Sequence, residues 1–167
     1  SISKKYGLKV LDRPNELARD NSPTLPVLQH AISQFSGNYD AVMTLQPTSP
    51  LRTYKHINES IDLFINDPIA DSLVSVTKAP HNCTPEKLMQ MNGKYLLGNN
   101  FLRRRQDIDE YFIRNGAAIY ISKVAIIDKH IIGDNILPYL MSKIDSLDID
   151  DIEDWKIVEA ILMSRFK

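Results

Sequence analysis

A short polar loop stiffened by proline is the stretch of this sequence best suited to bind a ligand. The loop, Gln46-Pro47-Thr48-Ser49-Pro50-Leu51-Arg52, follows an apolar run over 40–44 and carries an amide, two hydroxyls and a guanidinium. Each proline fixes φ and lacks an N–H for a sheet ladder, so the chain must leave the strand here. A rigid polar loop at the carboxyl end of a strand suits a phosphorylated or hydroxyl-rich ligand. The alternative is an ordinary proline-rich turn with a surface arginine.

A pair of carboxylates near the end of the chain could hold a hard cation. Asp148 and Asp150 are two residues apart in a predicted strand over 146–150, which would direct both side chains to one face. More acids follow in the first turn of a predicted helix over 152–166, where the helix dipole tolerates negative charge. The alternative is therefore that these acids only cap the helix.

Two further groups could meet an anionic ligand. Arg103, Arg104 and Arg105 form a basic cluster, and arginine binds carboxylate or phosphate in a bidentate manner. The alternative is a solvated surface cluster, the usual fate of adjacent like charges. Asn115 offers an amide beside Gly116, where a backbone can approach a ligand closely.

The elements that must position these residues alternate between strands and helices. Apolar patterning predicts strands over 40–45, 72–77, 116–122 and 146–150, and helices from Ser22-Pro23 to Phe35, from Thr53 to Asn66, and over 152–166. Residues 87–97 predict a hairpin about Asn92-Gly93, and 109–113 a short helix. The 167 residues therefore predict one α/β domain with a mainly parallel sheet and flanking helices.

Composition excludes several classes of protein. Apolar residues make up 43% of the chain and charged residues 25%, as in an ordinary globular domain. A formal net charge of −1 argues against partners such as nucleic acid or a membrane surface. The single cysteine, Cys83, excludes an internal disulfide and is compatible with a cytoplasmic location. No apolar stretch is as long as a membrane span.

Taken together, the motifs resemble those of the acylneuraminate cytidylyltransferases, the CMP-sialic acid synthetases. The most specific match is Leu45–Arg52 (LQPTSPLR). Three further segments follow the family's order: 12–24, from Asp12-Arg13-Pro14 to Thr24; 104–121, with Asn115-Gly116-Ala117; and 147–159, with Asp148-Ile149-Asp150.

The resemblance implies a Rossmann-like fold of the nucleotide-diphospho-sugar transferase type, with a small dimerisation or sugar-side insertion at 78–112. It implies a homodimer that transfers CMP from CTP to the anomeric hydroxyl of an acidic nine-carbon sugar, with release of pyrophosphate and with Mg²⁺ as cofactor. Carried over by position, the site residues are Arg13, Ser22, Thr24, Thr48 and Ser49 for the nucleotide; Gln46, Arg105, Asn115 and Tyr120 for the sugar; and Gln46, Asp148 and Asp150 for catalysis, the two aspartates also holding the metal. The double alanine at 117–118 leaves open whether Tyr120 or Ile119 takes the family's pocket position.

One family feature does not occur in this sequence. The family begins with a strand and a Gly-Ser-Lys type of loop that binds the triphosphate, and nothing like it precedes residue 12 here. We expect residues 1–167 to be a single cytidylyltransferase-like domain truncated at its N-terminus, with little or no activity by itself. A degenerate family member is the alternative.

Two other functions are compatible with the same residues. A metal-dependent glycosyltransferase would use Asp148-Ile149-Asp150 to hold the diphosphate of a sugar nucleotide. A non-catalytic binding or dimerisation module would use neither nucleotide nor metal. Which acidic sugar is used, among neuraminate, legionaminate and pseudaminate, cannot be determined from these residues.

Overall fold

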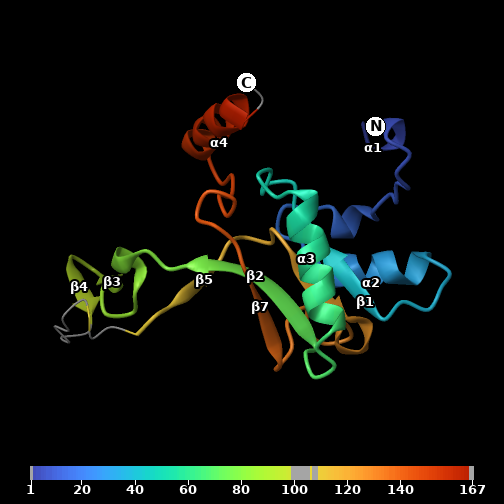
Figure 1. The fold of residues 1–167 in the computed structure, drawn as a ribbon, viewed down its shortest axis with the longest axis horizontal. Coiled ribbons are helices and arrows are strands. Elements are labelled where there is room, and N and C mark those ends of the chain that lie inside the picture. Colours follow the sequence, from blue (N-terminus) through green and yellow to red (C-terminus); the bar gives the residue numbers. More distant parts are fainter. Residues whose placement is uncertain (1, 99–105, 107–108, 166–167) are drawn as a thin grey trace.

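The computed structural model describes residues 2–98, 106 and 109–165 (Figure 1). The helices are α1 (Ile2–Lys5), α2 (Thr24–Gln34), α3 (Tyr54–Ile65) and α4 (Ile152–Arg165). The strands are β1 (Ala41–Thr44), β2 (Ser72–Lys78), β3 (Met89–Asn92), β4 (Tyr95–Gly98), β5 (Phe112–Arg114), β6 (Tyr120–Lys123) and β7 (Ile136–Leu140). Short 3-10 turns lie at Asn15–Leu17, His81–Cys83 and Val124–Ile126. The α/β class predicted from the sequence is confirmed.

The main sheet is built around β2. Its strands follow the order β1-β6-β2-β5, and β7 pairs with the other edge of β2. The expectation of a mainly parallel sheet is wrong for the described strands, because only the β2–β7 pairing is parallel, while β6 pairs antiparallel with β1 and β2 and β5 pairs antiparallel with β2. Alternation of apolar residues places a strand and its faces but carries no information about its direction. Direction is set by the connections between strands.

The antiparallel edge of β2 has an interrupted partner. β6 pairs with Ser72–Val74 and β5 with Val76–Lys78, so residues 112–123 run once along β2 in the opposite direction. Between the two strands, residues 115–119 leave the regular ladder, although the Ser75 N–H still donates to the Ile119 carbonyl at 2.9 Å. The interruption frees backbone carbonyls of this segment for other partners.

The core lies between this sheet and α3. Leu73 pairs in register with Ile121 and Leu137, and all three belong to or pack against the buried apolar cluster. The α3 helix crosses in front of the sheet (Figure 1) and adds Phe64 to the cluster. Its start is fixed by a reciprocal cap between Thr53 and His56, so the chain turns into the helix directly after Arg52.

The predicted hairpin is confirmed and projects from the body of the molecule (Figure 1). β3 and β4 form their own two-stranded sheet, joined by the two residues Gly93 and Lys94. Gly93 has a φ of +61°, the conformation that the first position of a type II′ hairpin turn requires. Lys78 pairs with Phe112 at the end of β2 from which the hairpin projects, and the role of residues 78–112 as an insertion stays a prediction.

Two short elements differ from the sequence predictions. Residues 112–114 form β5 instead of part of a helix, because β2 offers them a free edge to pair with. Residues 146–150 form a turn and an extended segment instead of a strand. Their one backbone bond to the loop runs from the Ile149 N–H to the Thr48 carbonyl, at 2.9 Å.

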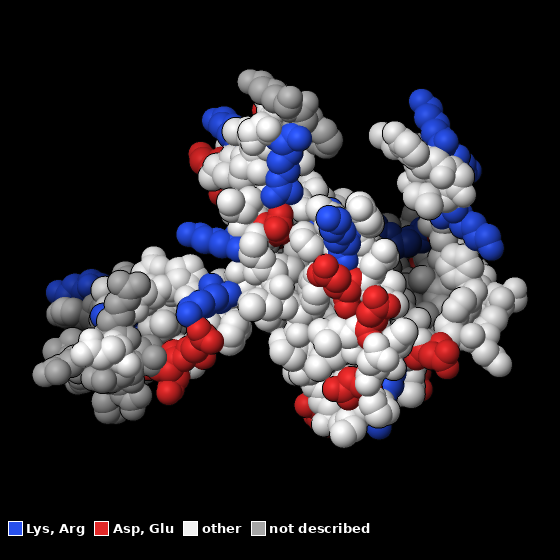
Figure 2. All heavy atoms as spheres, in the orientation of Figure 1, with Lys and Arg blue, Asp and Glu red and all other residues white. Residues whose placement is uncertain are grey.

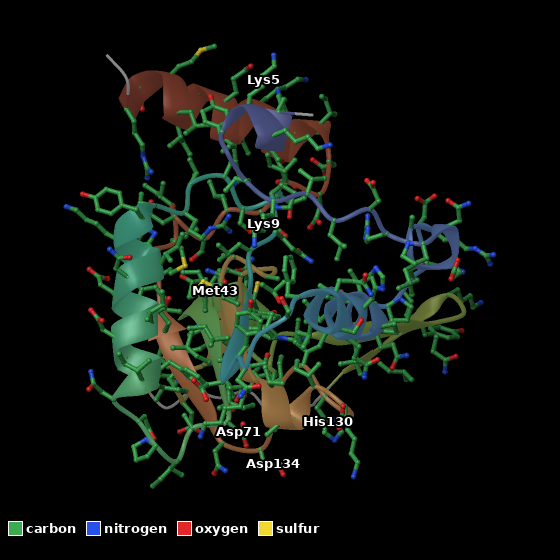
Figure 3. All side chains as sticks on the ribbon, turned by 90° about the vertical axis from the view of Figure 1, so that its right-hand side faces the viewer. Lys5, Lys9, Met43, Asp71, His130 and Asp134 are labelled. Atoms are coloured by element: carbon green, nitrogen blue, oxygen red, sulfur yellow. The ribbon has the colours of Figure 1, made fainter. Side chains whose placement is uncertain are left out.

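The end of the sheet far from α4 is closed by a carboxylate. The Asp71 side chain accepts hydrogen bonds from the Asp134 and Asn135 N–H groups at 3.1 and 3.0 Å, and Figure 3 shows Asp71 and Asp134 together at this end. These bonds, that from Asn135 first, outweigh desolvation and lower the pKa of Asp71. The turn before β7 is thereby fixed to the start of β2.

We expect Gly133→Ala to destabilise the fold by about 1–3 kcal/mol, the usual range for an overpacked site. A Cβ at this position would lie 2.3 Å from Asp71 Oδ1, so the carboxylate would have to move and lose its hydrogen bonds to the Asp134 and Asn135 N–H groups. Urea unfolding followed by circular dichroism measures the effect. Gly98→Ala is the control, because its Cβ would meet the flexible Met89 side chain. Equal unfolding midpoints for both variants would contradict the role of Asp71.

Candidate functional site

The proline-stiffened loop is held at both of its ends. The Gln46 N–H donates to the Ala117 carbonyl at 3.0 Å, and Arg52 Nη1 donates to the Gln46 and Ala118 carbonyls at 3.2 and 2.6 Å. Burial lowers the pKa of the Arg52 guanidinium, which nevertheless stays charged because arginine ionises so far above neutrality. Arg52 therefore supports the loop by holding the Gln46 carbonyl next to the Ala118 carbonyl.

The loop also meets the distant aspartate. Ser49 is fully buried, and its hydroxyl donates to Asp148 Oδ1 at 2.9 Å across 99 positions of sequence. Asp148 is half-buried. The nucleotide contact predicted for Ser49 stays a prediction, and the structure gives its hydroxyl a different partner.

Gly116 makes room for the same carboxylate. It has a φ of +63°, and a Cβ built on it would lie 2.3 Å from Asp148 Oδ2. Any other residue here would therefore be strained and would displace the carboxylate. The interruption between β5 and β6, the loop and Asp148 thus meet at one point.

Asn115 lies at that point but faces inward. It is buried; its Oδ1 accepts from the Ser75 hydroxyl at 2.6 Å, and its Nδ2 donates to Ser146 Oγ at 2.9 Å. The Ser75 hydroxyl also accepts from the Ile119 N–H at 2.9 Å. Direct sugar binding by Asn115 stays a prediction, whereas its role in holding residues 115–119 in place is visible. Sequence reasoning missed Ser75, because a serine in an alternating strand has the same pattern whether it is structural or solvated.

Tyr120, not Ile119, is on the side of the site. Ile119 is fully buried in the core, while Tyr120 is half-buried with Arg114 and Asp148 nearby. Burial raises the pKa of the Tyr120 hydroxyl and the Asp148 charge adds to this, while the charge and hydrogen bond of Arg114 oppose it. Arg114 was not singled out from the sequence. The feature of the sequence that could have identified Arg114 is its position directly before Asn115-Gly116.

The donor set fits a hard divalent cation of the Mg²⁺ type. Asp148 offers a carboxylate against the loop, and the more exposed Asp150 follows two residues later. Among residues 2–98, 106 and 109–165, no group of three or more His, Cys, Asp or Glu side chains could hold a metal ion. Mg²⁺ is commonly bound by one or two carboxylates and completed by phosphate oxygens and water, so two aspartates suffice.

The neighbouring acids serve the helix. The Asp151 carboxylate accepts from the Asp154 N–H at 2.9 Å, and Asp154 Oδ2 accepts from the N–H groups of Asp150 and Asp151. This reciprocal cap confirms that part of the acidic cluster only starts α4.

The remaining predicted residues are not joined to the loop. Arg13 and Thr24 are exposed, and the Ser22 hydroxyl closes its own turn by donating to the Glu16 carbonyl at 3.0 Å. None of the three forms a hydrogen bond or ion pair with residues 46–52 in the described part of the chain. Arg105 lies outside the described residues. The predicted roles of all four stay predictions.

An apolar cavity lies on the other side of the loop. It has a volume of about 730 Å³ and is lined by Pro47, Pro50 and Ile149 together with the α4 side chains Trp155, Val158, Glu159, Leu162 and Met163. The prolines therefore separate a polar side, towards Asp148, from an apolar side, towards α4.

The fold and the motifs agree with comparisons to known proteins. No family model matches the chain. A solved CMP:2-keto-3-deoxy-manno-octonic acid synthetase, complexed with CTP, superposes with a TM-score of 0.68 over 97% of this chain and 75% of its own, at 13% identity. That likeness shows the fold: the chain has the α/β fold of this nucleotidyltransferase.

Sequence relatives narrow the class. The N-acylneuraminate cytidylyltransferase of Escherichia coli O18:K1:H7 is 33% identical over 99% of this chain, and that of Streptococcus agalactiae serotype V is 28% identical over 92%. The resemblance predicted from the motifs is confirmed: the chain is similar to the N-acylneuraminate cytidylyltransferases along nearly its whole length.

The chain spans only part of these relatives. The match covers 40% of the Escherichia coli protein, but 72% of the CMP-N,N'-diacetyllegionaminic acid synthase of Legionella pneumophila, which is 27% identical. Activity, substrates and partners of the whole protein are therefore matters of proposal.

We expect Arg52→Met to lower the free energy of unfolding by about 1–3 kcal/mol, the usual cost of leaving buried acceptors without a donor. Methionine keeps the apolar stem but removes the donor to the Gln46 and Ala118 carbonyls. Arg19→Met, at an exposed position, should change the stability by less than about 0.5 kcal/mol. Urea denaturation of both variants measures this, and equal losses would refute the clamp.

Proposed function

We propose that this chain forms part of an enzyme that transfers CMP from CTP to the anomeric hydroxyl of an acidic nine-carbon sugar, with release of pyrophosphate. The observation that carries the proposal is the meeting of three separate motifs, where Ser49 of the loop bonds Asp148 above Gly116. The names of the relatives support the same chemistry, since they include acylneuraminate cytidylyltransferases and a CMP-legionaminic acid synthase. The proposed substrate is the class of acidic nine-carbon sugars and not one particular member of it.

The reaction joins two anions. The anomeric oxygen of the sugar attacks the α-phosphorus of CTP and loses its proton, while the bond from that phosphorus to the pyrophosphate oxygen breaks. Sugar carboxylate and triphosphate repel one another, so positive charge must offset the repulsion. Bound Mg²⁺ would neutralise phosphate oxygens, and Asp148 and Asp150 are the residues that would hold it.

The chain's own residues would bind and orient the substrates. Gln46 has its backbone fixed to Ala117 and Arg52, while its half-exposed side-chain amide forms no hydrogen bond with any described residue. That amide can serve both the sugar and the nucleotide from a fixed position. Arg114 adds a guanidinium beside the Tyr120 hydroxyl and is a candidate partner for the sugar carboxylate.

The projecting hairpin supports a homodimer. Exposed apolar side chains gather on β3 and β4: Met89, Met91, Tyr95, Leu96 and Leu97. Met91 and Leu96 pair across the hairpin and are 66% and 55% exposed. A second copy that covered this surface would bury these side chains in an interface between the two protomers.

Other partners have less support. On the face shown in Figure 2, the described Lys and Arg side chains are interspersed with Asp and Glu and form no broad basic area. None of the described helices is long and apolar enough to cross a membrane. A cytoplasmic location fits the proposal, since the sequence has a single cysteine.

The competing functions differ in what they bind. A sugar-nucleotide glycosyltransferase would bind a sugar nucleotide in calorimetry and ignore CTP, whereas the proposed enzyme binds CTP. A dimerisation module would bind neither and still elute as a dimer in gel filtration.

We expect Gln46→Ala, made in the full-length protein, to lower turnover about 100-fold, as loss of one donor at a reacting centre commonly does. The fold should be retained, because Gln46 holds the loop through its backbone. Pyrophosphate release from CTP and N-acetylneuraminate with Mg²⁺ measures turnover. Gln34→Ala, at the end of α2, is the matched control. Unchanged turnover in Gln46→Ala would refute the role.

We expect Leu96→Asp to raise the dissociation constant of the dimer by about 30-fold or more, because a charge would replace a central apolar contact. Sedimentation velocity over a range of concentrations measures the constant. Leu140→Asp, equally exposed on β7 but outside the hairpin, should leave it unchanged. A wild-type protein that stays monomeric at all concentrations would contradict the dimer.

A further inference from the structure

Ser49 and Asp148 form a closed pair within the candidate site. The Ser49 side chain is 0% exposed, and its hydroxyl donates to Asp148 Oδ1 at 2.9 Å. A fully buried hydroxyl cannot contact a ligand at the surface. Any effect of Ser49 on a ligand must therefore act through Asp148, to which its hydroxyl is bonded.

The position of Ser49 is itself fixed by backbone. Its N–H faces the Gln46 carbonyl at 3.4 Å, and Leu51, two residues on, is 1% exposed and anchors the loop in the core. The backbone that carries the Ser49 hydroxyl is therefore fixed to the loop and, through Leu51, to the core.

The carboxylate is held from two other directions. The Ile149 N–H donates to the Thr48 carbonyl at 2.9 Å, which fixes the backbone directly after Asp148 to the loop. Asp148 Oδ2 lies too close to the place where a Cβ of residue 116 would stand, at 2.3 Å, so the glycine leaves the room that the second oxygen occupies. Together these contacts set both the position and the rotation of the carboxylate.

We infer that Ser49 is a positioning residue that orients the Asp148 carboxylate towards a divalent cation. The inference rests on the proposed function, and it assigns Ser49 to the metal side of the site instead of to the nucleotide. A hydrogen bond to one oxygen of a ligating carboxylate directs its remaining lone pairs, and loss of such outer contacts commonly costs 10–100-fold in metal affinity.

The test measures Mn²⁺ affinity of the full-length protein in the presence of CTP, from the electron paramagnetic resonance signal of free Mn²⁺. Ser49→Ala should weaken binding about 10–100-fold. Ser60→Ala is the matched control, because Ser60 is equally buried but its hydroxyl donates to the Ile57 carbonyl within α3. It should bind Mn²⁺ as the wild type does.

A double-mutant comparison separates positioning from general damage. In an Asp148→Ala background, Ser49→Ala should weaken Mn²⁺ binding no further, since the group it orients is gone. If Ser49→Ala does not fold, Ser49→Cys keeps the volume with a weaker donor and should give an intermediate loss.

The outcomes distinguish this inference from the proposed function. A folded Ser49→Ala protein with wild-type Mn²⁺ affinity, alongside an Asp148→Ala protein that has lost it, overturns the role of Ser49 alone. A wild-type protein that binds no Mn²⁺ with CTP overturns both.

Discussion

The structure depends on an interruption in one strand pair. Residues 112–123 run along β2 as β5 and β6, but 115–119 leave the ladder around Gly116. In a continuous strand the Ala117 and Ala118 carbonyls would be available to the sheet alone. Here they accept from the Gln46 N–H and from Arg52. The loop between β1 and α3 is held because the neighbouring strand is broken.

The prolines explain why the loop needs this help. Pro47 and Pro50 have no N–H, and the turn within the loop is closed by a long backbone bond, from the Ser49 N–H to the Gln46 carbonyl at 3.4 Å. The Arg52 guanidinium supplies the missing donors from within the loop, and burial makes those bonds strong. The two prolines also form one wall of the apolar cavity beside α4. One loop thus separates a polar from an apolar environment.

Local sequence patterns predicted most of the helices and strands, but they did not predict which strands pair or in which direction they run. The bounds of α3 and α4 and the presence of the hairpin follow from caps, periodicity and turn chemistry. In contrast, α2 begins at Thr24 without a side-chain cap, and the hairpin turn lies at Gly93 and Lys94, one residue later than the predicted Asn92-Gly93. Strand direction does not follow from local patterns, because it depends on which edges remain free after the whole sheet has formed. The same reason accounts for β5, which was predicted as part of a helix, and for 146–150, which is tied to the loop by one backbone bond.

Residue type alone does not show which of the residues at the site are accessible and which are buried and bonded within the protein. Ser49, Ser75 and Asn115 have ligand-like side chains, yet the structure buries all three and bonds them to other protein groups. Their spacing along the chain gives no sign of this, since burial is a property of the assembled fold.

The acids near the end of the chain also fall into two groups, those that cap α4 and those that do not. Asp151 and Asp154 exchange hydrogen bonds with backbone N–H groups at the start of α4, so their charges stabilise the helix. Asp148 instead bonds a side chain of the loop. Asp151 and Asp154 are therefore engaged at the start of the helix, whereas the side chain of Asp148 is bonded to the loop. The sequence alone does not show which of these acids cap the helix. The structure separates them, because only residues within one turn of the helix start can accept hydrogen bonds from its free N–H groups.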